Sequence, residues 1–117
     1  METSTAVCLV LTTWPADQPV AGLARGLIEA RLAACVHVLA SGPSFYRWDG
    51  GVEEAEERQL VIKTTRERVA ALAAHLRAAH PYDLPELLVC DAEGSRAYAA
   101  WIHENVARDA LVDPVGE

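Results

Sequence analysis

The stretch that decides the fold is SFYRWDGGVEEAEERQLVIKTT, residues 44–65. Asp49-Gly50 near its middle is a strong hairpin signal, because a tight two-residue turn needs positive φ angles that glycine adopts at low cost. The flanking segments, about 44–48 and 52–64, are therefore predicted to be antiparallel strands. These strands are long, and long exposed edges pair with other chains, so we expect the protein to form oligomers.

The segments before this hairpin predict a strand, a helix and a second strand. AVCLVLTT, residues 6–13, is short, apolar and β-branched, which is typical of a strand buried on both faces. Asp17 is expected to cap a helix that tolerates Pro19 in its first turn. CVHVL, residues 35–39, then returns to extended structure. The apolar stripe of the helix is predicted at Leu23, Leu27, Ala30 and Ala34.

The segments after the hairpin complete the pattern. Thr65 is expected to cap a second helix, PELLVC (residues 85–90) is predicted to be a strand, and Ser95 is expected to cap a last helix. The order is β-α-β-β-α-β with a terminal helix, so we predict an α+β, ferredoxin-like sandwich. The predicted stripes of the two helices are Val69, Leu72, Leu76 and Ala79, and then Tyr98, Trp101, Ile102 and Asn105.

Length and composition suggest one globular domain. The chain has 117 residues, of which 51% are hydrophobic and 23% charged, so we expect a single domain with its core at about 6–108 and a short tail. A formal charge of −7 disfavours non-specific binding to nucleic acid or to an anionic membrane. Because no apolar run reaches about 18 residues, we expect no membrane span.

Three widely spaced cysteines give neither a disulfide framework nor a CxxC metal motif, which favours a reducing cytoplasm. The N-terminus has no basic region typical of a signal peptide. There is also no nucleophile elbow, HExxH, Walker loop or GxGxxG, so we do not expect an enzyme. An enzyme that uses Cys35 or His80 stays open as a third alternative, since such residues meet only in space.

Several side chains are candidates for binding. Cys35 and His37 would share one strand face about 7 Å apart, where they could bind copper or zinc or simply pack in a half-buried strand. Tyr46 and Trp48 also share a face and could line a pocket or pack between subunits. Lys63 follows an apolar run and would be costly to bury without an anion or a carboxylate.

Four glutamates, Glu53, Glu54, Glu56 and Glu57, follow the hairpin turn. They could hold a hard cation, pair with arginines across strands, or form a solvated strand edge. In HPYDLPELLV, residues 80–89, Pro81 and Pro85 fix φ at two points and would hold the segment in one extended shape. Such a loop would present His80, Tyr82 and Glu86 at set positions.

Together, ARGLIEARLAACVHVL (residues 24–39), the hairpin stretch and HPYDLPELLV resemble the divalent-cation tolerance (CutA) family, from about Val7 to Trp101. The resemblance implies a tight homotrimer, with the hairpin strands bridging subunits, and an architecture similar to the PII signalling proteins. It also implies tolerance of copper and other divalent cations, with Cu(II) or a similar ion bound but not essential for folding. Family motif positions fall on Cys35, Tyr46, Trp48, Gly50, Lys63, Thr64, His80, Pro81, Tyr82, Pro85 and Glu86.

The site residues expected from these patterns form two groups. Metal ligands are expected at His80, Cys35, His37 and Glu86, and ligand-binding residues at Tyr46, Trp48, Lys63 and Tyr82. The alternative function is a PII-like sensor that holds an anionic small molecule at the subunit clefts. The chain departs from some relatives, which have a cysteine in place of Thr12 and a histidine in place of Ala79, so its copper site would have fewer ligands.

Overall fold

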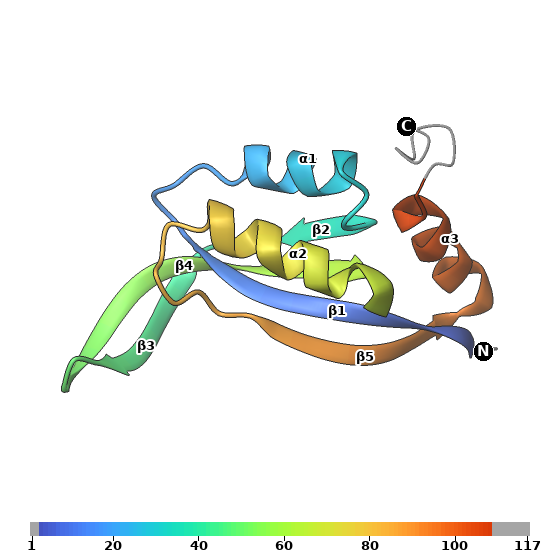
Figure 1. Cartoon of the computed structure of the whole chain (residues 1–117). Helices are drawn as coiled ribbons and strands as arrows, with labels where there is room; N and C mark the ends of the chain where they lie inside the picture. The colour runs from blue at the N-terminus through green and yellow to red at the C-terminus, as the bar shows by residue number, and fades with distance from the viewer. Residues whose placement is uncertain (1–2, 109–117) are drawn as a thin grey trace.

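The computed structural model describes residues 3–108 and shows an α+β sandwich (Figure 1). The predicted order of elements is confirmed, with the second strand of the pattern divided into two pieces. The predicted tail, residues 109–117, lies outside the described residues. The elements are β1 (Thr3–Pro15), α1 (Ala21–Glu29), β2 (Cys35–Val38), β3 (Gly42–Trp48), β4 (Gly51–Thr64), α2 (Arg66–Ala79), β5 (Leu88–Ser95) and α3 (Arg96–Val106).

The sheet is antiparallel and has the strand order β2-β4-β1-β5, with β3 also paired to β4. β2 and β3 lie against different halves of β4: β2 pairs with residues 60–63, and β3 with residues 51–57. This order is that of the ferredoxin-like fold, in which the first strand is central. β1 therefore lies between β4 and β5 and carries apolar side chains on both faces.

Helices α1 and α2 cover one face of the sheet (Figure 1). The core between them and the sheet contains Val10, Leu27, Ile62, Leu72 and Leu76, each 2% exposed or less. Burial of side chains of this size contributes about 1.5–3 kcal/mol each.

The other face carries apolar side chains that α1 and α2 do not reach. Leu9, Leu11 and Val61 lie on this open face and are partly exposed, and Leu88 is 54% exposed. α3 covers this face at one end, where Val7 packs with Ala99, Ile102 and Val106. Most of the open face is therefore apolar and accessible in the protomer.

The β3–β4 hairpin projects from the body of the molecule (Figure 1). Its turn residues Asp49 and Gly50 have φ angles of 56° and 81°, which identify the primed two-residue turn predicted from the sequence. β1 pairs with β4 only at residues 57–64, so the outer half of β4 is paired with β3 alone. The projection is consistent with a radius of gyration of 15.9 Å, compared with about 13 Å for a compact chain of this length.

Helix α1 differs from the prediction at both ends. It begins after Val20, which makes no side-chain capping bond, so the predicted Asp17 cap is wrong. The helix ends at Glu29, so Ala34 is buried outside it. The cause is Arg31, whose φ of 58° reverses the chain. The amides of Arg31 and Leu32 donate to carbonyls of the last turn at 3.0 Å, forming a Schellman motif without its usual glycine.

The left-handed Arg31 is held by contacts from other helices. Its guanidinium donates to the carbonyl oxygens of Glu104 and Asn105 at the end of α3, at 3.5 and 3.3 Å. Its own carbonyl accepts a hydrogen bond from Nε of Arg68 in α2, at 3.1 Å. Arg31 thus joins the end of α1 to α2 and α3, which offsets the cost of a left-handed residue with a Cβ.

The last strand and helix also differ in detail from the predictions. β5 begins at Leu88 rather than at Pro85, which lacks an amide donor, and continues to Ser95. Ser95 caps α3 as predicted, since its Oγ accepts from the amide of Tyr98 at 3.4 Å. Of the residues predicted along one side of α3, Ile102 is buried at 1% exposed, whereas Tyr98 and Trp101 are each 41% exposed. Thr65 precedes α2 as predicted but makes no side-chain cap.

Candidate functional site

His80 fastens the loop that follows α2 to the sheet. Its ring is 8% exposed and lies between Trp14 and Tyr82, with centroid distances of 4.9 and 5.0 Å. The backbone amide of Tyr82 donates to Nδ1 at 3.0 Å. Nδ1 is therefore the unprotonated nitrogen, and Nε2 carries the proton and donates to the carbonyl oxygen of Thr13 at 2.7 Å. Both ring nitrogens are bonded to backbone groups.

Two further hydrogen bonds join the loop to β4. The Tyr82 hydroxyl donates to Oε2 of Glu57 at 2.8 Å, and Nε2 of Gln59 donates to Oε2 of Glu86 at 2.8 Å. Gln59 also donates to the carbonyl oxygen of Thr12 at 2.9 Å. These bonds place two carboxylates, from different segments of the chain, at fixed positions beside the hairpin.

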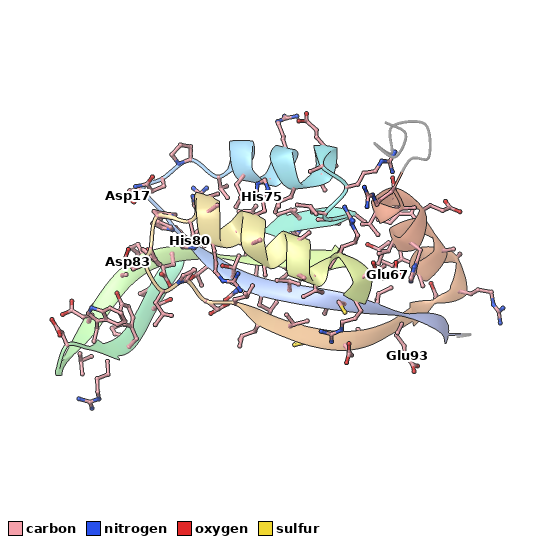
Figure 2. The ribbon with its side chains drawn as sticks, viewed as in Figure 1. Asp17, Glu67, His75, His80, Asp83 and Glu93 are labelled. Carbon is pink, nitrogen blue, oxygen red and sulfur yellow. The ribbon has the colours of Figure 1, made fainter. Side chains whose placement is uncertain are left out.

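A cleft of about 820 Å³ lies between the hairpin and this loop. One wall comes from β3 and β4, and the other from residues 81–86. Figure 2 shows Asp83 on the loop near the base of the hairpin and His80 at the start of the same loop. The cleft is lined by Thr13, Ser44, Phe45, Tyr46, Trp48, Glu57, Gln59, Pro81, Tyr82, Asp83, Leu84, Pro85 and Glu86.

The cleft is acidic and aromatic. Glu57, Asp83 and Glu86 line it, and no lysine, arginine or histidine stands among its described lining residues. Burial, followed by the hydrogen bond to Glu57, raises the pKa of Tyr82 from 10.0 to about 12, and the charges of Glu57, Tyr46 and Asp17 add to the effect. Tyr82 is therefore a neutral donor over the whole physiological range.

The structure divides the expected ligand-binding residues into two places. Tyr46, Trp48 and Tyr82 line the cleft, whereas Lys63 lies elsewhere, beside α3. Lys63 Nζ donates to the Tyr98 hydroxyl at 3.1 Å and lies 5.3 Å from the centre of that ring. The hydrogen bond to Tyr98 raises the pKa of Lys63, although burial opposes it. The sequence did not indicate Tyr98 as the partner of Lys63.

The expected metal ligands are also spread over the protomer. Glu86 lines the cleft, and His80 lies at its edge with its nitrogens engaged. Cys35 and His37 are on β2, opposite Lys63 and Val61, and do not line the cleft. Within residues 3–108, no group of three or more His, Cys, Asp or Glu side chains could hold a metal ion.

Some contributors to the cleft were not expected as site residues. Glu57 was considered only within the acidic run, and Gln59 was not among the expected site residues. Glu57 and Gln59 lie on the same face of β4 as Glu53, which pairs with Tyr46. Strand alternation was therefore the signal that could have placed both residues on the side of Tyr46. Thr13 and Asp83 line the cleft without a clear sequence signal, because their positions depend on contacts between distant segments.

Thr12 and Ala79, the two positions at which the copper site is expected to lack ligands, differ in their exposure. Thr12 is fully buried, and its Oγ1 donates to the carbonyl oxygen of Thr13 at 3.4 Å. Ala79 is exposed at the end of α2.

Within the described part of the chain, no helix is long and apolar enough to cross a membrane. The cysteines Cys8, Cys35 and Cys90 are all free thiols.

Comparison with known proteins identifies the family. Residues 8–105 match the family described as CutA1 divalent ion tolerance protein. The divalent-cation tolerance protein CutA of Thermus thermophilus is 41% identical over 98 residues, which is 83% of this chain and 95% of that protein.

Solved structures give the same result. CutA from Xylella fastidiosa is 41% identical, with a TM-score of 0.81 over 86% of this chain and 98% of that one. A protein described as the periplasmic divalent cation tolerance protein CutA of Archaeoglobus fulgidus is 29% identical, with a TM-score of 0.81 over 86% and 99% of the two chains. The chain belongs to the CutA1 divalent ion tolerance protein family.

Proposed function

We propose that the protein binds divalent cations, Cu(II) among them, at the cleft between the hairpin and the 80–87 loop. The observation that supports this most directly is the pair of carboxylates Glu57 and Glu86, each held through Oε2 by a hydrogen bond from a neighbour. Both residues line the cleft, together with a third carboxylate, Asp83. The named relatives are divalent-cation tolerance proteins, which agrees with this choice of ligand.

The donor set defines what kind of binding to expect. Carboxylate oxygens suit hard divalent cations, and Cu(II) is first in the affinity order of divalent first-row metals. Because three suitable side chains do not meet at one point among residues 3–108, water or a neighbouring subunit would supply the remaining ligands. His80 could join only by giving up one of its backbone hydrogen bonds. We therefore expect weak to moderate affinity.

Calorimetric titration of the full chain with Cu(II) tests the proposal. Binding should weaken severalfold in Glu86→Gln, which retains the shape of the side chain but removes its charge. The matched control is Glu67→Gln, an exposed carboxylate in α2 at the other end of the sheet (Figure 2). Absence of heat with the wild-type protein would refute copper binding, and equal affinities of Glu86→Gln and wild type would remove the cleft from the site.

We also propose that the protein is a homotrimer, as the family resemblance implies. Support comes from the apolar open face at Leu9, Leu11, Val61 and Leu88, together with the unpaired outer edges of β3 and β5. Burying these side chains between subunits would remove them from water. The cleft adjoins this face, so a neighbouring subunit would complete its walls.

Sedimentation equilibrium tests the assembly. The mass should be three times the chain mass of 12.6 kDa at micromolar protein. Leu88→Lys should shift the distribution towards smaller species, whereas Ile28→Lys, an exposed apolar residue on α1, should not. A wild-type monomer would refute the proposal. A cytoplasmic location is consistent with the free thiols, although the Archaeoglobus relative is described as periplasmic.

An anion sensor built on Lys63 has less support. The aromatic residues expected to join Lys63 lie in a cleft lined by carboxylates, and Lys63 contacts Tyr98 instead. An anion placed near Tyr46 and Trp48 would face Glu57 and Asp83, and like charges repel. The charge of the cleft favours cations.

A further inference from the structure

The acidic cleft has a second wall that an inorganic cation does not need. Tyr46 and Trp48 are 43% and 53% exposed and occupy the same face of β3, about 7 Å apart. Phe45, also in the lining, is 66% exposed. Tyr82 approaches from the loop, close enough for the charge of Tyr46 to affect its pKa. Aromatic side chains therefore stand on both sides of the space.

Aromatic rings and carboxylates together recognise one class of ligand. The face of a tyrosine or tryptophan ring attracts a cation within about 6 Å of its centre, most strongly when the cation is weakly hydrated. Carboxylates nearby add charge complementarity. A hydrated metal ion uses the oxygens and gains little from the rings, whereas an alkylated ammonium group can contact both.

The size of the cleft points in the same direction. At about 820 Å³, it lies within the range of roughly 300–1,000 Å³ that is typical of small-molecule sites and is far larger than a metal ion requires. Hydrogen bonds also fix the loop side of the cleft before any ligand binds. Tyr82 is hydrogen-bonded to Glu57, Gln59 to Glu86, and His80 to the backbone. Fixed walls reduce the ordering needed when a ligand binds.

We propose that the cleft binds a small organic ammonium ion, with its alkyl groups against the rings of Tyr46 and Trp48 and its charged centre balanced by Glu57 and Glu86. This inference deepens the proposed cation-binding function, because it rests on the same carboxylates, but its specificity depends on the aromatic wall. The ligand class is set by three features of the site: negative charge, aromatic faces and a space of small-molecule size.

The test compares choline with its neutral carbon isostere, 3,3-dimethylbutan-1-ol, by NMR titration of the wild-type full chain. The two probes have the same shape and differ in the charge of one centre. Choline should bind about threefold to thirtyfold more tightly than the neutral isostere, which is the range expected from a cation over aromatic rings. Equal affinity, or no binding of choline up to the solubility limit of the neutral probe, would overturn the proposal without the use of any variant.

Matched variants locate the site. Trp48→Leu should weaken choline binding by about threefold or more, whereas Trp101→Leu, at an exposed tryptophan outside the cleft, should not. Glu57→Gln should weaken it too, with Glu104→Gln as its control. Sedimentation checks that each variant keeps the wild-type assembly. If Trp48→Leu changes the assembly, the comparison of Glu57→Gln with Glu104→Gln decides the result.

A parallel titration with Cu(II) separates this inference from the proposed function. Trp48→Leu should lose choline affinity and keep its Cu(II) affinity, because a metal ion binds the carboxylates alone. If Cu(II) binds the cleft and choline does not, the organic-cation inference fails while the metal proposal stands. If choline binds and Cu(II) does not, the metal proposal fails alone.

Discussion

Replacing His80 by alanine should detach the 80–87 loop from the sheet and destabilise the protein. The substitution leaves the Thr13 carbonyl and the Tyr82 amide without their bonds of 2.7 and 3.0 Å. A buried backbone group without a partner costs about 1–3 kcal/mol. Both residues are partly buried, so water can recover part of the loss, and the Thr13 carbonyl keeps its hydrogen bond from the Thr12 hydroxyl at 3.4 Å. Adding the lost ring contacts with Trp14, we expect a total of about 2–4 kcal/mol.

Urea unfolding at one fixed protein concentration measures this loss, since assembly makes apparent stability depend on concentration. The control is His75→Ala, which removes a partly buried imidazole from α2 that has no hydrogen bond among those of the described residues. We expect it to cost less than about 1 kcal/mol. Similar losses for the two variants would show that the backbone bonds of His80 contribute little and would refute the reasoning.

Tyr82 gives a second readout of the same variant. Burial is the largest cause of its raised pKa, so detachment of the loop should lower the pKa from about 12 towards 10.0. Ultraviolet titration of the tyrosines would detect this change. A pKa that stays near 12 in His80→Ala would mean that the loop remains in place without its histidine.

The pKa of Tyr82 is higher in the folded state than its ordinary value of 10.0, so its contribution to stability should be complete below pH 10 and lost as pH rises through about 12. Unfolding curves across this window should show the loss, and Glu57→Gln should reduce it; a flat profile would contradict it. Arg31→Gly should be more stable than Arg31→Ala by about 1 kcal/mol in urea unfolding, because both lose the guanidinium and only alanine has a Cβ at a φ of 58°. Equal stabilities would show that the left-handed conformation carries no cost. Ser95→Ala should cost about 0.5–2 kcal/mol through the lost cap of α3, and a calorimetric melting temperature equal to that of wild type would argue against the cap.

The order of elements could be predicted because local signals agreed with one another. Asp49-Gly50 requires positive φ, and the apolar runs in β1 and β4 have the length of strands. The end of α1 could not be predicted, since nothing local indicates that an arginine adopts a left-handed conformation. Contacts of Arg31 with α2 and α3 stabilise it there.

The site could be predicted only in part, for a similar reason. The prolines of the 80–89 segment indicated a rigid loop, and strand alternation placed Tyr46 and Trp48 together. The register between β4 and the loop cannot be derived from either pattern, yet it pairs Tyr82 with Glu57. The same lack of tertiary information allowed His80 to be considered a free ligand, although backbone groups occupy both of its nitrogens.

The central position of β1 has a consequence for synthesis of the chain on the ribosome. β1 is made first, yet its partners come late: Cys8 pairs with Thr64, and Val7 with Ala92. Until β4 emerges, an apolar strand with two unpaired edges has no native neighbour. Sheets with such distant pairings fold slowly, and strand edges that are still unpaired promote aggregation. Newly made chains should therefore be most vulnerable to aggregation, and most in need of a holding chaperone, before the second half of the domain has been translated.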